Sequence, residues 1–196
     1  MAKKTGEKFE AILDAAVKVI AQNGYHNSQV TKIAREARVA DGTIYLYFEN
    51  KDDILVSLFH TRMDEFATKV KQKIDLVDTP EEKLYQLIYM HFKIFALDHN
   101  LAIVTQIEIR QSNRRIRNDI GKSLKKYHRL IEELVEFGVQ KGKFHDGIDV
   151  RLMRQMIFGI LDETVSSWVM KDMKYDLLEL VDPIYFLIAN GIERKS

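Results

Sequence analysis

The chain has no cysteine, only two prolines, and no excess of either charge among its 196 residues. Without cysteine there are no disulfides, thiolate zinc sites or cysteine nucleophiles. No apolar run approaches the roughly 18 residues that span a bilayer, and charged side chains interrupt the first 25 residues, which argues against a signal peptide. The sequence therefore predicts a cytoplasmic protein with no membrane partner.

Recognisable catalytic patterns are missing as well. The six histidines form no HxxxH or HExxH pair, and no glycine-rich phosphate loop or nucleophile-elbow serine occurs. Asp162 and Glu163 are adjacent carboxylates in an apolar stretch, but neighbouring residues on a helix point about 100° apart, which is unsuitable for a catalytic dyad. We therefore expect no enzymatic activity, no metal site and no cofactor.

The balance of charge is nearly even, with 30 basic and 29 acidic residues. Up to residue 51 the chain carries eight Lys and Arg against six Asp and Glu. A slightly basic N-terminal part permits nucleic-acid binding without requiring it. With 46% hydrophobic residues, the chain is long enough to bury a sizeable core.

Apolar residues recur with a period of 3.6 nearly everywhere, which together with the scarcity of proline predicts an all-α chain. In the N-terminal part, Gly24 ends a first apolar stripe, Ser28 is expected to cap a second helix, and a short third helix covers about 42–48. Asn50 is expected to cap a long helix that reaches about residue 73. Beyond the break at Pro80 the pattern predicts helices over about 80–97, 101–112, 115–140, 150–170 and 177–192.

The last two of these helices are apolar on more than one face. In the first, Leu152 and Met156 lie on a different side from Met153 and Ile157. A helix that is apolar all round is buried on all sides. At the end of a chain of this size, that pattern predicts a homodimer held together by the last two helices of each copy.

Residues 41–51, DGTIYLYFENK, hold the densest group of aromatic residues. Ile44 and Phe48 are four apart and share a face suited to the core. Thr43 and Tyr47 lie on the opposite side with Tyr45 between the two faces, and their hydroxyls can bond phosphates or base edges. Spacing alone does not exclude a purely structural role, because aromatic runs in helices usually belong to a core.

Two short helices joined by a short turn are the helix-turn-helix pattern, whose second helix enters the DNA major groove. The run from Phe9 to Phe59 resembles the DNA-binding domain of TetR-family repressors. The resemblance is carried by ILDAA at 12–16, NGY at 23–25, IA at 33–34, GTIYLYF at 42–48 and NKDDIL at 50–55. Their order and spacing are more specific than any one of these pieces.

This resemblance implies a TetR-like, all-α protein. Its DNA-binding domain would cover residues 1–50, with the helix-turn-helix at about 28–47. A larger ligand-binding and dimerisation domain would cover 51–196, entered through a connecting helix at about 51–73. The implied function is a homodimeric repressor that binds a palindromic double-stranded operator and is released by a small molecule. The implied DNA contacts are Lys3, Gln29, Thr31, Gly42, Thr43, Tyr45, Tyr47 and Lys51.

The chain departs from the family pattern at two positions of the turn. Arg38 stands where the family usually has glycine, and Ala40 where it usually has serine. If the turn requires a positive φ, the arginine costs about 1 kcal/mol. Asp41 is expected to replace the missing serine cap.

The segment NLAIVTQIEIRQSNRRIR at 100–117 is the informative part of the C-terminal region. On one continuous helix, Ile103, Ile107, Arg110 and Arg114 would form a stripe that changes from apolar to cationic. Such a stripe suits a ligand with an apolar tail and an anionic head. The alternative is structural, with Arg110 paired to a carboxylate such as Glu108, Asp162 or Glu163, because an isolated buried arginine is costly.

This segment and VRLMRQMIFGILDETVSSWVM at 150–170 resemble the fatty-acid-degradation regulators of the TetR family. The resemblance implies a repressor of fatty-acid degradation genes whose effector is a long-chain acyl-CoA or fatty acid. It implies a tunnel for the acyl chain, with arginines near its mouth that meet the CoA phosphates. The residues expected at this site are Phe92, Phe95, Ile103, Gln106, Ile107, Arg110, Phe158 and Trp168.

Two other functions remain open from the sequence. One is a TetR-type repressor that responds to a different hydrophobic ligand, as drug-efflux regulators do. The other is a helical interaction protein that does not bind DNA, in which residues 43–47 form a protein-binding patch. Salt dependence separates the second from a repressor, because binding through several phosphates weakens steeply with salt.

Overall fold

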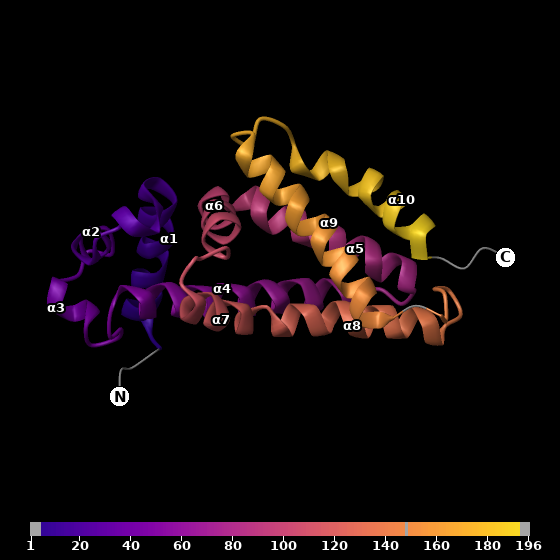
Figure 1. Cartoon of the computed structure of the whole chain (residues 1–196), viewed down its shortest axis with the longest axis horizontal. Helices are drawn as coiled ribbons and strands as arrows, with labels where there is room; N and C mark the ends of the chain where they lie inside the picture. Colours follow the sequence, from indigo (N-terminus) through magenta and orange to yellow (C-terminus); the bar gives the residue numbers. More distant parts are fainter. Residues whose placement is uncertain (1–4, 148, 193–196) are drawn as a thin grey trace. The chain divides into compact units, whose positions relative to one another are not determined.

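The computed structural model describes residues 5–147 and 149–192, so the predicted DNA contact Lys3 lies outside the described residues. Over these ranges the chain forms α-helices, as predicted, and one 3₁₀ helix, which was not predicted (Figure 1). They are α1 (Glu7–Asn27), α2 (Val30–Glu36), α3 (Asp41–Ile44), α4 (Lys51–Ile74), α5 (Pro80–Leu97), α6 (His99–Glu108), α7 (Arg114–Ser123), α8 (Lys125–Gln140), α9 (Val150–Met170), η1 (Leu177–Leu180) and α10 (Val181–Ile192).

Within the described residues, no single helix is both long and apolar enough to cross a membrane. Only α5 and α6 taken together reach that length and composition, as a pair bent at the break between them.

The chain divides into two compact units, each interrupted in sequence. The first unit consists of the residues up to 62 together with 99–123, and so contains α1 to α3, the first half of α4, α6 and α7. The second unit consists of 63–98 and the residues from 124 onward, with the rest of α4, α5, α8, α9, η1 and α10.

Helix α1 forms the centre of the first unit and packs against α2 and α6. Its first turn carries Glu7 and Glu10, whose charges suit the positive end of the helix dipole. Near its end, Gly24 adopts φ 71° and ψ 158°, which interrupts the helical backbone. The predicted end of the first apolar stripe is therefore confirmed as a sharp break at Gly24.

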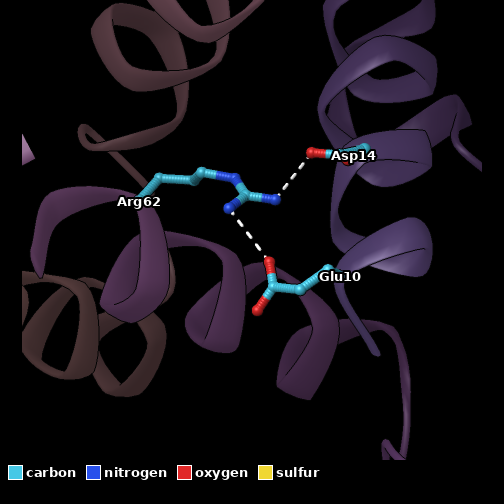
Figure 2. Close-up of polar contacts among 3 residues, drawn as sticks. All are labelled: Glu10, Asp14 and Arg62. Atoms are coloured by element: carbon cyan, nitrogen blue, oxygen red, sulfur yellow. Dashed lines mark hydrogen bonds and ion pairs between the residues drawn. The ribbon is translucent and has the colours of Figure 1, made fainter. Parts of the chain in front are cut away.

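Helix α4 is attached to α1 by ion pairs. Arg62 is largely buried, and its Nη1 lies 3.1 Å from an oxygen of Glu10 while Nη2 lies 2.6 Å from Asp14 (Figure 2). At the start of α4, Asn50 accepts a hydrogen bond of 2.9 Å from the backbone N–H of Asp53. The predicted cap at Asn50 is confirmed.

The other two predicted caps are wrong. Helix α2 is preceded by Gln29 without a side-chain cap, because the hydroxyl of Ser28 donates instead to the carbonyls of Gly24 and Val19, at 2.7 and 3.2 Å. Asp41 is the first residue of α3 rather than its cap. Ser28 is fully buried, and its hydroxyl satisfies the carbonyl of Gly24, whose usual helical donor, the backbone N–H of Ser28, bonds Tyr25 instead.

The prediction of one cationic stripe along 103–114 is wrong. Helix α6 ends at Glu108, and a new helix starts only at Arg114, so these residues do not share one helical face. The long helix expected over 115–140 is also divided, into α7 and α8, at Leu124. Leu124 itself retains helical angles, φ −79° and ψ −12°.

In the second unit, α5 packs against α8, α9 and α10. Pro80 opens α5, and Thr79 with Glu82 forms a capping box, in which each side chain bonds the other residue's backbone N–H. Pro183 lies in the first turn of α10, where a missing N–H does no harm.

Candidate DNA-binding and effector sites

The helix-turn-helix is formed by α2, α3 and the turn between them. Ile33, Ile44 and Phe48 are at most 1% exposed, which confirms that the aromatic segment contributes one face to the core. Arg38 adopts φ 56° in the turn, so the predicted left-handed position is present and is occupied by a non-glycine residue. The turn therefore contains a left-handed residue although an arginine occupies the position.

The other face of the segment is open. Tyr45 is 59% exposed, Gly42 is exposed, and Thr43 and Tyr47 are half-buried. The ring of Tyr47 lies 6.5 Å from that of Phe9 and so leans on the core of α1. An open row of hydroxyl-bearing side chains on a rigid base can meet phosphates and base edges.

Two further predicted DNA contacts, Gln29 and Thr31, are exposed at the start of α2 in the same unit. Sequence reasoning missed Leu46, which is 67% exposed between Tyr45 and Tyr47. An exposed leucine among polar residues is apolar surface of the kind that contacts a thymine methyl group. Its position outside the Ile44 and Phe48 stripe was the signal in the sequence.

Lys51 has a second task that the sequence did not indicate. Its Nζ donates to the carbonyls of Tyr25 and His26, at 3.0 and 3.1 Å, and lies 4.5 Å from the centre of the Tyr25 ring. These carbonyls belong to the last residues of α1, where a cation is favoured by the helix dipole. Its ammonium therefore stabilises α1, and its backbone N–H at the start of α4 is the group placed to meet a phosphate.

Tyr25 is buried and lies in contact with two other elements of the first unit. Its hydroxyl donates to Asp52 at the start of α4, and its backbone N–H donates to Glu108 at the end of α6. Burial, followed by the hydrogen bond to the Asp52 carboxylate, raises the pKa of Tyr25 above its usual value. Tyr25 therefore remains a neutral donor at any physiological pH.

The predicted effector residues are divided between the two units. In the first, Gln106 is 3% exposed with no partner for Oε1 among the described residues, while Ile107 is 46% exposed. Arg110 is exposed, and its Nη1 donates to the carbonyl of Gln106 at 2.6 Å. Glu108, one of the carboxylates suggested as its partner, instead accepts from Tyr25 and Gln111.

In the second unit, Phe92, Phe95 and Trp168 are at most 3% exposed, and Phe158 is half-buried. The indole N–H of Trp168 donates to the carbonyl of Tyr175 at 2.8 Å. Phe92, Phe95 and Trp168 thus belong to the apolar core of the second unit, and the assignment of individual ligand contacts stays a prediction.

A polar pair lies inside this aromatic region of the second unit. Nδ1 of His91 is 2.9 Å from the hydroxyl of Tyr127, and the rings of Phe66 and Phe95 each lie 5.3 Å or less from the His91 ring. Burial lowers the pKa of His91 to about 3, so the ring is neutral. Nε2 has no partner among the described residues.

Helices α9 and α10 leave apolar side chains exposed in the second unit. The exposed residues of α9 are Leu152, Met156, Ile160 and Met170, and those of α10 are Phe186 and Leu187. Their exposed fractions range from 37% to 68%. Both helices therefore carry the second apolar face that the sequence predicts, and this face is uncovered in a single chain.

Among residues 5–147 and 149–192, no group of three or more histidine or acidic residues could hold a metal ion. A surface pocket of about 310 Å³ in the second unit is lined by Lys71, Lys83, Leu130 and Phe137 among others, and by none of the predicted effector residues.

Comparison with known proteins gives matches along nearly the whole chain. Residues 12–58 match the model for bacterial regulatory proteins of the tetR family, and residues 59–191 match the model for the C-terminal region of YsiA-like proteins. The fatty acid metabolism regulator protein of Bacillus subtilis is 52% identical over 193 residues, which is 98% of this chain and 100% of that protein.

Solved structures agree with these matches. FadR from Bacillus subtilis, in complex with stearoyl-CoA, is similar with a TM-score of 0.91 and 53% identity, covering 94% of this chain and 99% of that one. The fatty acid degradation regulator FadR from Bacillus halodurans also has a TM-score of 0.91, with 54% identity over 93% of this chain and 98% of that one.

Proposed function

The chain belongs to the TetR family of bacterial regulatory proteins, and we propose that it represses fatty-acid degradation genes and is released from DNA by long-chain acyl-CoA. The observation that carries the proposal is its likeness, over nearly its whole length, to a fatty acid regulator with stearoyl-CoA bound. Binding to operator DNA places its action in the cytoplasm.

The DNA-binding half of the proposal uses the exposed face of the helix-turn-helix. Thr43, Tyr45 and Tyr47 contact phosphates or base edges, and the backbone N–H of Lys51 meets a phosphate. Gln29, Thr31 and Gly42 complete the predicted contact surface. Two copies would place their recognition segments, residues 42–48 of each copy, about 34–36 Å apart, which is one turn of the double helix.

The uncovered apolar residues of α9 and α10 support a homodimer built on these helices. A symmetric dimer buries the same patch on both copies, so each of these side chains is buried once in each copy and contributes twice to the dimer. Burial of a leucine or phenylalanine contributes about 1.5 to 3 kcal/mol, which makes six such side chains on each copy a substantial interface.

The effector half of the proposal requires differential binding to two states of the protein. Moving operator occupancy from 99:1 to 1:99 requires about 5.5 kcal/mol of preference for the released state. A long acyl chain gains about 0.8 kcal/mol per buried CH₂ group, so part of its burial energy is sufficient. In this proposal, Phe92, Phe95 and Phe158 contact the acyl chain of the effector. Arg110 supplies a positive charge for its anionic head.

The DNA-binding half is tested with an operator selected from a pool of random duplexes by the purified protein. We expect a palindrome, and an affinity whose logarithm falls by about 0.9 per neutralised phosphate against the logarithm of the salt concentration. Tyr47→Phe should weaken binding at every salt concentration, whereas Tyr89→Phe removes a hydroxyl of α5, which belongs to the second unit, and serves as control. A selected pool without symmetry, or an affinity independent of salt, contradicts the proposal.

A further inference from the structure

The break at Gly24 leaves the backbone N–H of Tyr25 without a helical acceptor, and Glu108 of α6 accepts its hydrogen bond instead. In an uninterrupted helix the N–H of Tyr25 would bond the carbonyl four residues earlier, but the angles of Gly24 turn the chain away. That N–H donates to Oε1 of Glu108 at 3.0 Å, across 83 positions of sequence. The last residue of α6 is therefore attached to the broken end of α1.

Glu108 is an unfavourable residue for this place unless its charge or position matters. It is only 6% exposed, and it stands at the C-terminus of α6, where the helix dipole disfavours a negative charge. A glutamine would accept only a weaker, neutral hydrogen bond from Tyr25, but it would avoid the penalty for burying a charge. Helix stability alone therefore does not explain the carboxylate.

Tyr25 also holds the beginning of α4. Its hydroxyl donates to Asp52, and its carbonyl accepts a hydrogen bond of 3.0 Å from Nζ of Lys51. Lys51 and Asp52 are the first two residues of α4 and follow the recognition segment after only Glu49 and Asn50. One residue thus joins the end of α6 to the base of the recognition segment.

Helix α4 is attached to α1 at a second place, through Arg62 with Glu10 and Asp14 (Figure 2). That attachment involves the first half of α1, whereas Tyr25 lies beyond the break. Of these two attachments, the one at Tyr25 also contacts the end of α6. Tyr25 therefore contacts both the end of α6 and the first turn of α4, while Arg62 is bonded to α1 further along α4.

We infer that Glu108 and Tyr25 form a coupling clasp, meaning the contacts of Tyr25 with Glu108, Asp52 and Lys51, which passes the position of α6 to the recognition segment. Glu108 is a positioning residue that touches neither DNA nor effector in this role. The inference rests on the proposed release by acyl-CoA and assigns residues to the transmission step. In this account the clasp contributes to the factor by which effector lowers operator affinity, and not to effector binding itself.

A purely structural tie predicts something different. If Glu108 only stabilises the fold, its replacement lowers the melting temperature and leaves the ratio of operator affinities without and with effector unchanged. If it transmits a shift of α6, that ratio falls while effector binding by free protein is preserved. The ratio is the coupling factor between the two ligands, typically about 5 to 150.

The test compares wild type with Glu108→Gln, Tyr25→Phe and the control Glu136→Gln, which changes an exposed glutamate of α8. Operator dissociation constants are measured without and with saturating palmitoyl-CoA, and the palmitoyl-CoA affinity of free protein from the fluorescence of Trp168. We expect the coupling factor to fall at least about fivefold in both clasp variants, with effector affinity within about threefold of wild type. The control should match wild type.

Tyr25→Phe keeps the backbone N–H and removes only the hydroxyl bonded to Asp52, so it decides the question if Glu108→Gln unfolds. A coupling factor unchanged in every folded clasp variant overturns the clasp and leaves the proposed function intact. A wild-type protein that palmitoyl-CoA does not release from its operator overturns the proposed function, and the clasp with it.

Discussion

Arg38 is a non-glycine residue in a backbone conformation that favours glycine. The turn between α2 and α3 places this arginine at φ 56°, a conformation that an L-residue other than glycine adopts at a cost of about 1 kcal/mol. The buried side chains of Ile33, Ile44 and Phe48 on either side hold the turn in place. The packed core therefore compensates for the strain.

Replacement of Arg38 by glycine should raise the free energy of unfolding by about 0.5 to 1 kcal/mol, because relief of strain exceeds the added entropy of the unfolded chain. Urea unfolding measures the change. The matched control is Ala37→Gly. Ala37 precedes Arg38 and has helical angles, so its replacement by glycine should lower the free energy of unfolding by a similar amount. If both variants changed the free energy of unfolding in the same direction, strain at Arg38 would be excluded as the cause.

The second residue-scale prediction concerns His91, whose pKa burial lowers to about 3. Below the unfolded value of about 6.5, the unfolded chain binds a proton that the folded chain does not, so stability falls as the pH decreases from about 6.5 toward 3. His91→Gln has no titrating ring and can still bond Tyr127. The difference in unfolding free energy between variant and wild type should shift in favour of the variant by about 2 kcal/mol from pH 7 to pH 5.

Chemical denaturation of both proteins at several pH values checks this, because all other titrating groups are common to the pair. A difference that stays constant from pH 7 to pH 5 would show that His91 is protonated as easily in the fold as in water.

At the scale of elements, α1 depends on its break at Gly24. The angles there, φ 71° and ψ 158°, are close to a region open essentially to glycine alone. The break ends the regular helix and leaves the N–H of Tyr25 without a helical acceptor. This N–H donates a hydrogen bond to Glu108 instead. A glycine in the family motif thus determines both the shape of α1 and its attachment to α6.

Gly24→Ala should lower the free energy of unfolding by about 1 to 3 kcal/mol, although nothing lies within 4 Å of the added methyl group. Gly121→Ala is the matched control, since Gly121 is exposed within α7 and its methyl group would also meet nothing. There the change should stabilise the protein by about 0.5 to 1 kcal/mol. Thermal unfolding of the two variants separates backbone strain from crowding, and destabilisation by both would count against strain as the cause.

The elements also show how far the sequence could predict the fold. The local signals located α5 and α9 and the cap at Asn50, because apolar period, proline and capping residues act within a few positions. The end of α6 at Glu108 was missed, since Glu108 is held by Tyr25, far away in sequence. Ser28 was misassigned for a similar reason, because its hydroxyl bonds α1 rather than α2.

The candidate site was predictable to different degrees. The aromatic segment was assigned to a core face and an open face from its spacing, and the exposed fractions of Ile44 and Tyr45 confirm that division. The second role of Lys51 and the pair of His91 with Tyr127 were not predictable, because each depends on which helices pack together. Contacts with DNA and effector still stand as predictions.

At the scale of the whole molecule, the uncovered faces of α9 and α10 predict a dimer. Leu187→Glu should raise the dimer dissociation constant at least about tenfold, because it removes a buried apolar side chain and introduces a charge in two copies of the interface. Sedimentation equilibrium measures the change. Leu97→Glu is the control, since Leu97 is 77% exposed at the end of α5, outside the two apolar faces. A Leu187→Glu protein as dimeric as wild type would exclude this face.

The most direct test of the account is the release of the wild-type dimer from its selected operator, followed by fluorescence anisotropy of labelled DNA. Palmitoyl-CoA, palmitate and free CoA are added in turn, below the concentrations at which the lipids form micelles. We expect release by palmitoyl-CoA, saturating near one molecule per chain, and none by free CoA. An operator complex that survives saturating palmitoyl-CoA at the same salt concentration would contradict the proposed release by effector.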